Sequence, residues 1–177
     1  MHTHLDYSFT LNTDLVRLRF IEGSCADALV RLDGDLLTVA MPAGFDFNVP
    51  RHQEWANKVL CEVLRKRAKQ LLPPRLDATA RQFDLRYQRV YIKDVCSRWG
   101  SCSSLGNINL SLWLLLAPSR LVDYVIRHEL AHLNEMNHSP RFWAEVDRMT
   151  GGPGQGKLLE REMKAFARGL FAAGWRK

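Results

Sequence analysis

The sequence has no long hydrophobic run, which excludes a membrane-spanning helix. Its longest apolar stretch, Leu112 to Ala117, is far shorter than the roughly 20 residues that are needed to cross a bilayer. The first residues do not combine a basic segment with an apolar one, so we expect no secretory signal and a cytoplasmic protein without membrane partners. Low-complexity tracts and repeats are also absent, which excludes fibrous and solenoid proteins.

Cysteine is scarce, and no two cysteines have the CxxC spacing of many zinc and redox sites. Four cysteines in 177 residues are too few for a disulfide scaffold. We therefore expect reduced, mostly buried thiols at Cys25, Cys61, Cys96 and Cys102.

The composition, 46% hydrophobic and 25% charged, is that of an ordinary globular domain, and we expect one domain over residues 1–177. The formal net charge of +6 is compatible with a nucleotide or nucleic-acid partner, although solvated basic faces explain it equally well. Basic residues that could receive phosphate groups are Arg81, Arg86, Arg89, Lys93 and Arg98.

The first fifty residues have the pattern of a β-rich lobe. Alternating apolar and basic side chains predict a strand over Val16–Phe20. Asp33 and Gly34, between two apolar runs, predict the turn of a hairpin. Apolar residues at helical spacing then predict a long helix over 50–72, which we expect Pro73 and Pro74 to end.

The rest of the chain is predicted to alternate strands and helices, with a catalytic core over 88–150. A short helix over 76–83 precedes strands over 88–95 and 107–115, joined by the polar turn SRWGSCSSLG. Ser119 and the Ser139–Pro140 pair predict the starts of two helices. A flexible loop, GGPGQG, precedes a last helix that packs through Leu159, Met163, Phe166 and Leu170.

The segment HELAH places His128 and His132 four residues apart, on one face of a predicted helix, where both can bind one metal ion. The spacing alone is a weak signal, because HExxH occurs by chance in unrelated helices. Its neighbours are apolar, however, so the helix is expected to be buried and its polar residues need partners. A bound cation would be one such partner.

A third histidine, His138, follows where the chain can reverse, and Asn134 and Asn137 suit a left-handed turn. Three histidines leave one position of a tetrahedral zinc ion open, which is typical of catalytic sites. Glu129 is then the expected general base, with one Zn²⁺ per chain as cofactor.

Several neighbouring residues allow other interpretations. Glu135 and Glu145 are alternative third ligands, although His138 is favoured over both. Phe142 and Trp143 are expected to be core aromatics under the site. Tyr124 lies one turn before His128, where its hydroxyl could support the site, but a plain surface or core role is favoured.

The segments SRWGSCSSLGNINLSLWLLLAP and DYVIRHELAHLNEMNHSPRFW resemble the YgjP-like metallopeptidase family, relatives of the WLM and SprT-like zincins. The resemblance covers Tyr91 to Met149. It implies a small α+β, zincin-like fold, in which a β-rich N-terminal part and a twisted sheet pack on the HExxH helix and further helices. It implies metal binding by His128, His132 and His138, and catalysis by Glu129.

The resemblance also suggests that the WGSC region is an edge strand that binds substrate, by analogy with other zincins. The expected substrate-binding residues are Trp99, Gly100, Ser101 and Asn109. The leading prediction is a zinc-dependent peptidase that acts on a peptide or protein. Two alternatives stay open: a metal-dependent nucleotide pyrophosphohydrolase, which no Walker-type glycine loop supports, and a zinc-stabilised nucleic-acid-associated module without catalysis.

Overall fold

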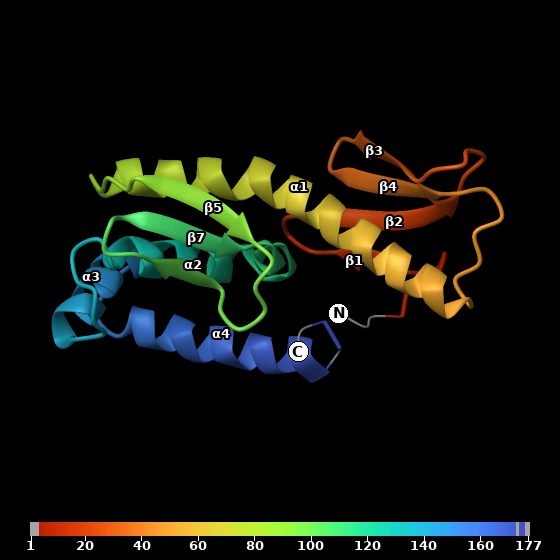
Figure 1. The fold of residues 1–177 in the computed structure, drawn as a ribbon. Coiled ribbons are helices and arrows are strands. Elements are labelled where there is room, and N and C mark those ends of the chain that lie inside the picture. Colours follow the sequence, from red (N-terminus) through yellow and green to blue (C-terminus); the bar gives the residue numbers. More distant parts are fainter. Residues whose placement is uncertain (1–3, 173, 176–177) are drawn as a thin grey trace.

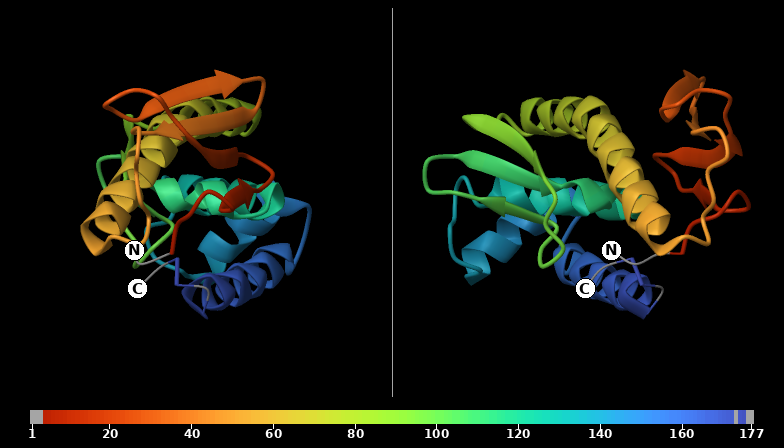
Figure 2. Two further views of the ribbon diagram at one scale, coloured as in Figure 1. Left: turned by 90° about the vertical axis from the view of Figure 1, so that its right-hand side faces the viewer. Right: turned by 45° about the vertical axis from the view of Figure 1, so that its right-hand side comes forward.

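The computed structural model describes residues 4–172 and 174–175, which form strands, helices and turns in two sheet-containing parts. Within these residues, two separate sheets lie along one long helix, and three further helices gather around the second sheet (Figures 1 and 2). The predicted α+β fold class is therefore confirmed. The four cysteines are free, as expected, although Cys25 is exposed and the other three are only partly buried.

The first sheet has the strand order β1 (Thr10–Asn12), β2 (Arg17–Glu22), β4 (Leu36–Met41) and β3 (Leu29–Asp33). Strands β2 and β4 are parallel, and the other neighbours are antiparallel. Along β2 and β4 every second side chain is buried and the others are exposed or half-buried, so one face of the sheet packs on the core. The β3–β4 hairpin is confirmed. Its turn lies one residue later than predicted, because Gly34, with φ 58°, is its first residue.

Helix α1 (Pro50–Gln82) continues through Pro73 and Pro74. The predicted stop at residue 72 and the separate helix over 76–83 are therefore wrong. Each internal proline removes one backbone hydrogen bond and favours a kink, and α1 bends along its length (Figure 2).

Tertiary contacts explain why α1 does not end at its prolines. Leu72 and Leu76 lie one turn apart on either side of them, and both side chains are fully buried. Between these two leucines, Arg75 donates hydrogen bonds of 2.5 and 2.8 Å to the carboxylate of Asp123 in another helix. Burial and this ion pair thus offset the helix-breaking tendency of the prolines.

The second sheet has the order β5 (Arg89–Lys93), β7 (Asn107–Ser111) and β6 (Gly100–Cys102), so β6 is an edge strand. Strand β5 is parallel to β7, whereas β6 is antiparallel to it. The segment predicted as a polar turn therefore contains a strand.

The second half of the strand predicted over 107–115 is a 3-10 helix, η1 (Leu112–Leu116). All five of its side chains are buried, on every side of the segment. Ser111 ends the strand, because its hydroxyl accepts a 3.3 Å hydrogen bond from the backbone N–H of Trp113. Sequence alone could not separate these cases, since a short apolar run fits either a buried strand or a buried helical turn.

Helices α2 (Ser119–Ala131), α3 (Pro140–Thr150) and α4 (Gln155–Ala172) follow. The predicted cap of α3 is confirmed, because the Ser139 hydroxyl accepts a hydrogen bond from the N–H of Phe142. The GGPGQG loop is shorter than predicted, since α4 already begins at Gln155. No helix in the described part of the chain is both long and apolar enough to span a membrane.

Ser119 is the first residue of α2 and not its cap, which corrects the prediction for this helix. The residue before the helix is Pro118, which has no side chain that can accept a hydrogen bond. Instead, the carboxylate of Asp14, 105 residues earlier, accepts a 2.7 Å hydrogen bond from the N–H of Ser119. A distant segment thus satisfies an N–H group that α2 leaves without an intrahelical partner.

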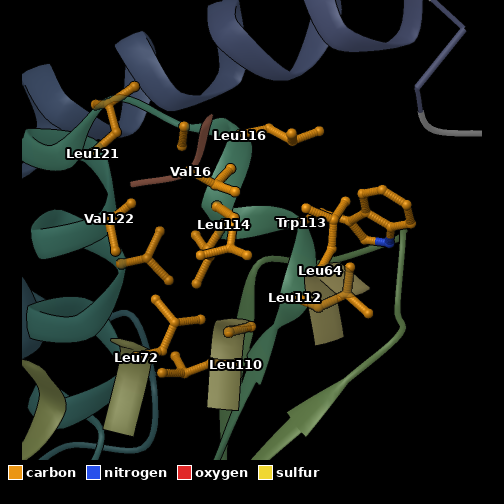
Figure 3. Packing of buried hydrophobic residues seen from close by; sticks show 14 of the residues in the cluster. Val16, Leu64, Leu72, Leu110, Leu112, Trp113, Leu114, Leu116, Leu121 and Val122 are labelled. Atoms are coloured by element: carbon orange, nitrogen blue, oxygen red, sulfur yellow. The ribbon is translucent and has the colours of Figure 1, made fainter. Parts of the chain in front are cut away.

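One continuous core joins these elements. Figure 3 shows its centre, where side chains from α1, the end of β7, η1 and α2 meet. Buried residues labelled there include Leu64, Leu72, Leu110, Leu114 and Val122. The core side of α2 is therefore fixed by α1 and η1, which leaves its opposite side for the polar residues of HELAH.

We expect Asp14→Ala to destabilise the protein by about 1 kcal/mol, the usual cost of losing a helix N-terminal cap. Asp14→Asn, which keeps an acceptor oxygen, should lose much less. The measurement is urea unfolding followed by circular dichroism. Asp27→Ala, at an exposed aspartate, is the control, and an equal loss in both alanine variants would contradict the capping role.

Candidate metal centre

The three predicted histidines lie together. His128 is on the last turn of α2, His132 is at its C-terminal cap, and His138 lies just before α3. One ring nitrogen from each lies within 4.8 Å of the others. In the described residues this is the one group of three potential ligands that could hold a metal ion.

The chain reverses between His132 and His138 without the left-handed asparagines that we expected. Neither Asn134 nor Asn137 has a positive φ. Instead, the N–H groups of Leu133 and Asn134 donate to carbonyl oxygens of the last turn of α2, which extends the right-handed turn. The prediction was right about the reversal and wrong about its backbone conformation.

The arrangement of the ring nitrogens fits a metal ion. The Nε2 atoms of His128 and His138 are 3.1 Å apart, close to the separation of about 3.3 Å between two nitrogens of a tetrahedral zinc ion. Nδ1 of His132 lies 3.1 Å from the carbonyl oxygen of Glu135, to which it can donate a hydrogen bond. This hydrogen bond would leave Nε2 of His132 without a proton and able to ligate.

The alternative carboxylate ligands are engaged elsewhere. Glu135 contributes its backbone carbonyl to His132, and its carboxylate is not part of the cluster. The Glu145 carboxylate accepts hydrogen bonds from Asn134 and Arg148, which lowers its pKa through the hydrogen bonds to Arg148.

The surroundings of His128 and His132 disfavour the charged forms of these two side chains. Burial lowers the pKa of His128 to about 3, and it also lowers the pKa of His132. Phe142 is fully buried and stacks on His132, with 4.5 Å between the ring centroids, as expected of a core aromatic under the site. The hydroxyl of Tyr124 lies 3.3 Å from Nδ1 of His128, so this buried tyrosine also contacts the site. Neutral imidazole is the form that binds metals.

Glu129 lies beside the cluster and is 5% exposed. Burial raises the pKa of its carboxyl group to about 8, and the positive charge of Arg98 opposes this shift. The carboxylate makes no hydrogen bond or ion pair with any described residue, so it is available to a group that enters the cavity.

Gly100 allows the backbone of β6 to pass directly over this carboxylate. A Cβ atom at Gly100 would lie 2.6 Å from Oε1 of Glu129, closer than any real contact of this kind. Residue 100 must therefore be glycine, or Glu129 must move.

A cavity of about 520 Å³ opens over the histidines and Glu129. Two of the four predicted substrate-binding residues, Gly100 and Ser101 of β6, line this cavity. Trp99 instead lines an adjoining pocket. Asn109, on the next strand, does not line the cavity, but it donates a 3.1 Å hydrogen bond to the hydroxyl of Ser101.

The basic residues considered for phosphate binding do not gather around this cavity. Only Arg98 lines it, and Lys93 lines a neighbouring hollow of about 260 Å³ together with Arg98. A larger hollow, of about 790 Å³, lies beside the N-terminal half of α1 and contains none of the three histidines.

Sequence reasoning missed the residues of α4 that approach the site. Met163 and Ala167 line the pocket that adjoins the cavity, with His128 and Glu129 on its other side. Met163 was interpreted only as part of a packing stripe, Ala167 was not singled out, and no motif in the sequence marks either as part of a site.

Comparison with known proteins shows which family the chain belongs to. The sequence pattern of the YgjP-like metallopeptidase domain matches residues 28–157 of this chain. The chain belongs to the YgjP-like metallopeptidase family. This match includes β6, α2 and α3, and therefore all three histidines and Glu129. A search among curated proteins gives no match.

Two solved structures are similar to this YgjP-like chain. The metallopeptidase zymogen abylysin of Pyrococcus abyssi is 24% identical, with a TM-score of 0.48, over 54% of this chain and 93% of that one. The metallopeptidase zymogen jannalysin of Methanocaldococcus jannaschii is 18% identical, with a TM-score of 0.46, over 53% of this chain and 94% of that one.

Cys102 lines the cavity, but its thiol stays protonated because burial raises its pKa to about 11. Burial also raises the pKa of the Cys61 thiol, to about 12. At pH 8 only about one part in a thousand of the Cys102 thiol, and less of the Cys61 thiol, is thiolate, the reactive form. We expect iodoacetamide to alkylate the exposed Cys25 well before Cys61 or Cys102, as measured by peptide mass spectrometry. Urea-unfolded protein, in which this difference should vanish, is the control. Faster reaction at Cys102 than at Cys25 would contradict a protonated thiol at Cys102.

Proposed function

We propose that this protein is a zinc-dependent peptidase, in which His128, His132 and His138 hold one zinc ion. The observation that carries this proposal is geometric: one ring nitrogen from each of the three histidines lies within 4.8 Å of the others, beside the buried carboxyl group of Glu129. Three nitrogen ligands leave a coordination position open, as in catalytic zinc sites, and structural zinc sites are normally closed by four protein ligands.

Glu129 is the proposed general base and acid. When bound, zinc supplies a Lewis acid that polarises the scissile carbonyl group and makes a water molecule easier to deprotonate. Glu129 takes the proton from the attacking water and delivers it to the leaving amine nitrogen. Its position suits both transfers, because its carboxylate faces the cavity and has no competing partner among the described residues.

The substrate is proposed to bind in extended form along β6. The outer edge of this strand is unpaired in the sheet, so its backbone groups can add a peptide strand. Gly100 brings this backbone next to Glu129, and Ser101 and Cys102 continue it along the cavity. A peptide held there would cross the cavity within reach of the histidines and Glu129. We also propose a cytoplasmic location, in keeping with the four free cysteines.

Purified wild-type protein is expected to contain about one zinc ion per chain, because three ligands are already close together. His138→Ala should lose most of it, since one of the three ligands is missing. Elemental analysis measures both. His52→Ala is the matched control, as His52 lies on α1 outside the cluster. A wild-type protein without metal after zinc supplementation would overturn the proposal.

Glu129→Gln should keep its zinc and lose cleavage of a peptide mixture by roughly 10²- to 10⁴-fold, the usual contribution of general acid–base catalysis. Mass spectrometry of the products measures this. Glu54→Gln, at an exposed glutamate on α1, is the control. Glu129-dependent release of pyrophosphate from nucleotides, without peptide cleavage, would favour the pyrophosphohydrolase instead. Salt-sensitive nucleic-acid binding that is independent of Glu129 would favour the non-catalytic module.

A further inference from the structure

A second hollow, of about 270 Å³, adjoins the candidate metal centre on the side of α4. His128, Glu129 and Gly100 line both this pocket and the cavity over the histidines. A peptide bound along β6 would therefore place a residue next to the cleaved bond at the mouth of this pocket. The pocket is smaller than the roughly 300–1,000 Å³ of pockets for whole small-molecule ligands, so one side chain suits it better.

The walls of this pocket are mostly apolar. Val125 and Tyr124 contribute from α2, Trp99 from the residue just before β6, and Met163 and Ala167 from α4. Met163 is buried, and Trp99 packs against the Phe166 ring of α4, with centroids 5.9 Å apart. Because α4 is fixed by these contacts, the pocket has a defined width. An apolar side chain that enters it loses contact with water without leaving a polar group unpaired.

Two acidic residues line the pocket: Glu129, the proposed general base, and Glu160, which is already paired with lysines. The Glu160 carboxylate lies 2.9 Å from the ammonium group of Lys164 and 3.6 Å from that of Lys157. A basic side chain of a substrate would have to compete with two lysines for it. Arg98 is exposed and lines both this pocket and the cavity over the histidines.

The residues of α4 that form the wall lie outside the part of the chain that the family pattern matches. The family match ends at residue 157, whereas Glu160, Met163, Lys164 and Ala167 follow it. The metal centre and the wall of the pocket thus come from different parts of the chain. A change in α4 can alter the pocket without touching the histidines.

We propose that this pocket selects the substrate: it receives an uncharged apolar side chain, of about the size of Leu, Met or Phe, from a residue beside the cleaved bond. Met163 and Ala167 determine the size that is accepted. This inference rests on the proposed peptidase function for the placement of the peptide, and it adds the class of substrate.

The experiment uses zinc-loaded Glu129→Gln protein as a binding probe and wild-type protein as the enzyme. Both are offered acetylated, amidated hexapeptides based on alanine, in which each position is varied in turn. Ala167→Trp fills the pocket, and Met163→Ala widens it, in either background. Ala165→Trp is the matched control, because Ala165 is exposed on the same helix and does not line the pocket. Thermal unfolding shows which variants are folded.

We expect the Glu129→Gln protein to retain peptides with Leu, Met or Phe at one position about 10- to 100-fold more strongly than those with Gly or Asp. Ala167→Trp should abolish this preference, Ala165→Trp should keep it, and Met163→Ala should shift it toward Phe and Trp. In wild-type protein the same position should lie next to the cleaved bond.

Failure of the pocket and failure of the proposed function give different results. The pocket proposal is overturned, and the peptidase proposal kept, if cleavage prefers acidic or basic residues. The same holds if Ala167→Trp and Met163→Ala leave the preference unchanged. A pocket-dependent preference in binding without Glu129-dependent cleavage overturns the peptidase and keeps the pocket. The pocket proposal is also overturned if binding shows no preference at any peptide position.

Discussion

Helix α2 must satisfy two opposite environments at once, and the rest of the structure follows from how it does so. One side of the helix carries Val122, Ile126 and Leu130, which are buried in the core. His128 and His132 project from the other side, with Glu129 at the boundary, and these polar side chains would be costly to bury without partners. The protein meets both demands by packing α1 and η1 on the apolar side and leaving a cavity on the polar side.

Distant segments hold α2 in this position. Asp14 satisfies its first N–H group, Arg75 of α1 pairs with Asp123, and Arg120 pairs with Glu162 of α4. Each of these contacts is polar and joins segments far apart in the sequence. Because a catalytic arrangement tolerates little displacement, such restraints around α2 are as relevant to the proposed chemistry as the residues that face the cavity.

The two proposals assign different tasks to different elements. The histidines and Glu129 come from α2 and the segment before α3, where the chemistry is proposed to occur. Strand β6 would align the peptide, and α4 would decide which side chain is accepted beside the cleaved bond. Such a division would allow the substrate preference to change while the metal centre stays the same.

The sequence by itself determined the elements whose patterns are local. The HExxH spacing, the Ser139–Pro140 start of α3 and the alternation in β2 each depend on residues within one or two turns, so they could be predicted. The position of the third histidine was predictable too, because the predicted break between two helices lets the chain fold back after His132.

Only the tertiary structure decided the rest. Pro73 and Pro74 lie inside a helix because buried leucines on both sides and the Arg75–Asp123 pair outweigh their local preference. The run Leu112–Leu116 is helical because it is buried on every side, and α2 is capped by Asp14 from a remote segment. The pocket wall on α4 could not be predicted from the sequence either. A residue that lines a pocket and one that fills a core can have the same spacing along a helix, and only the packing distinguishes them.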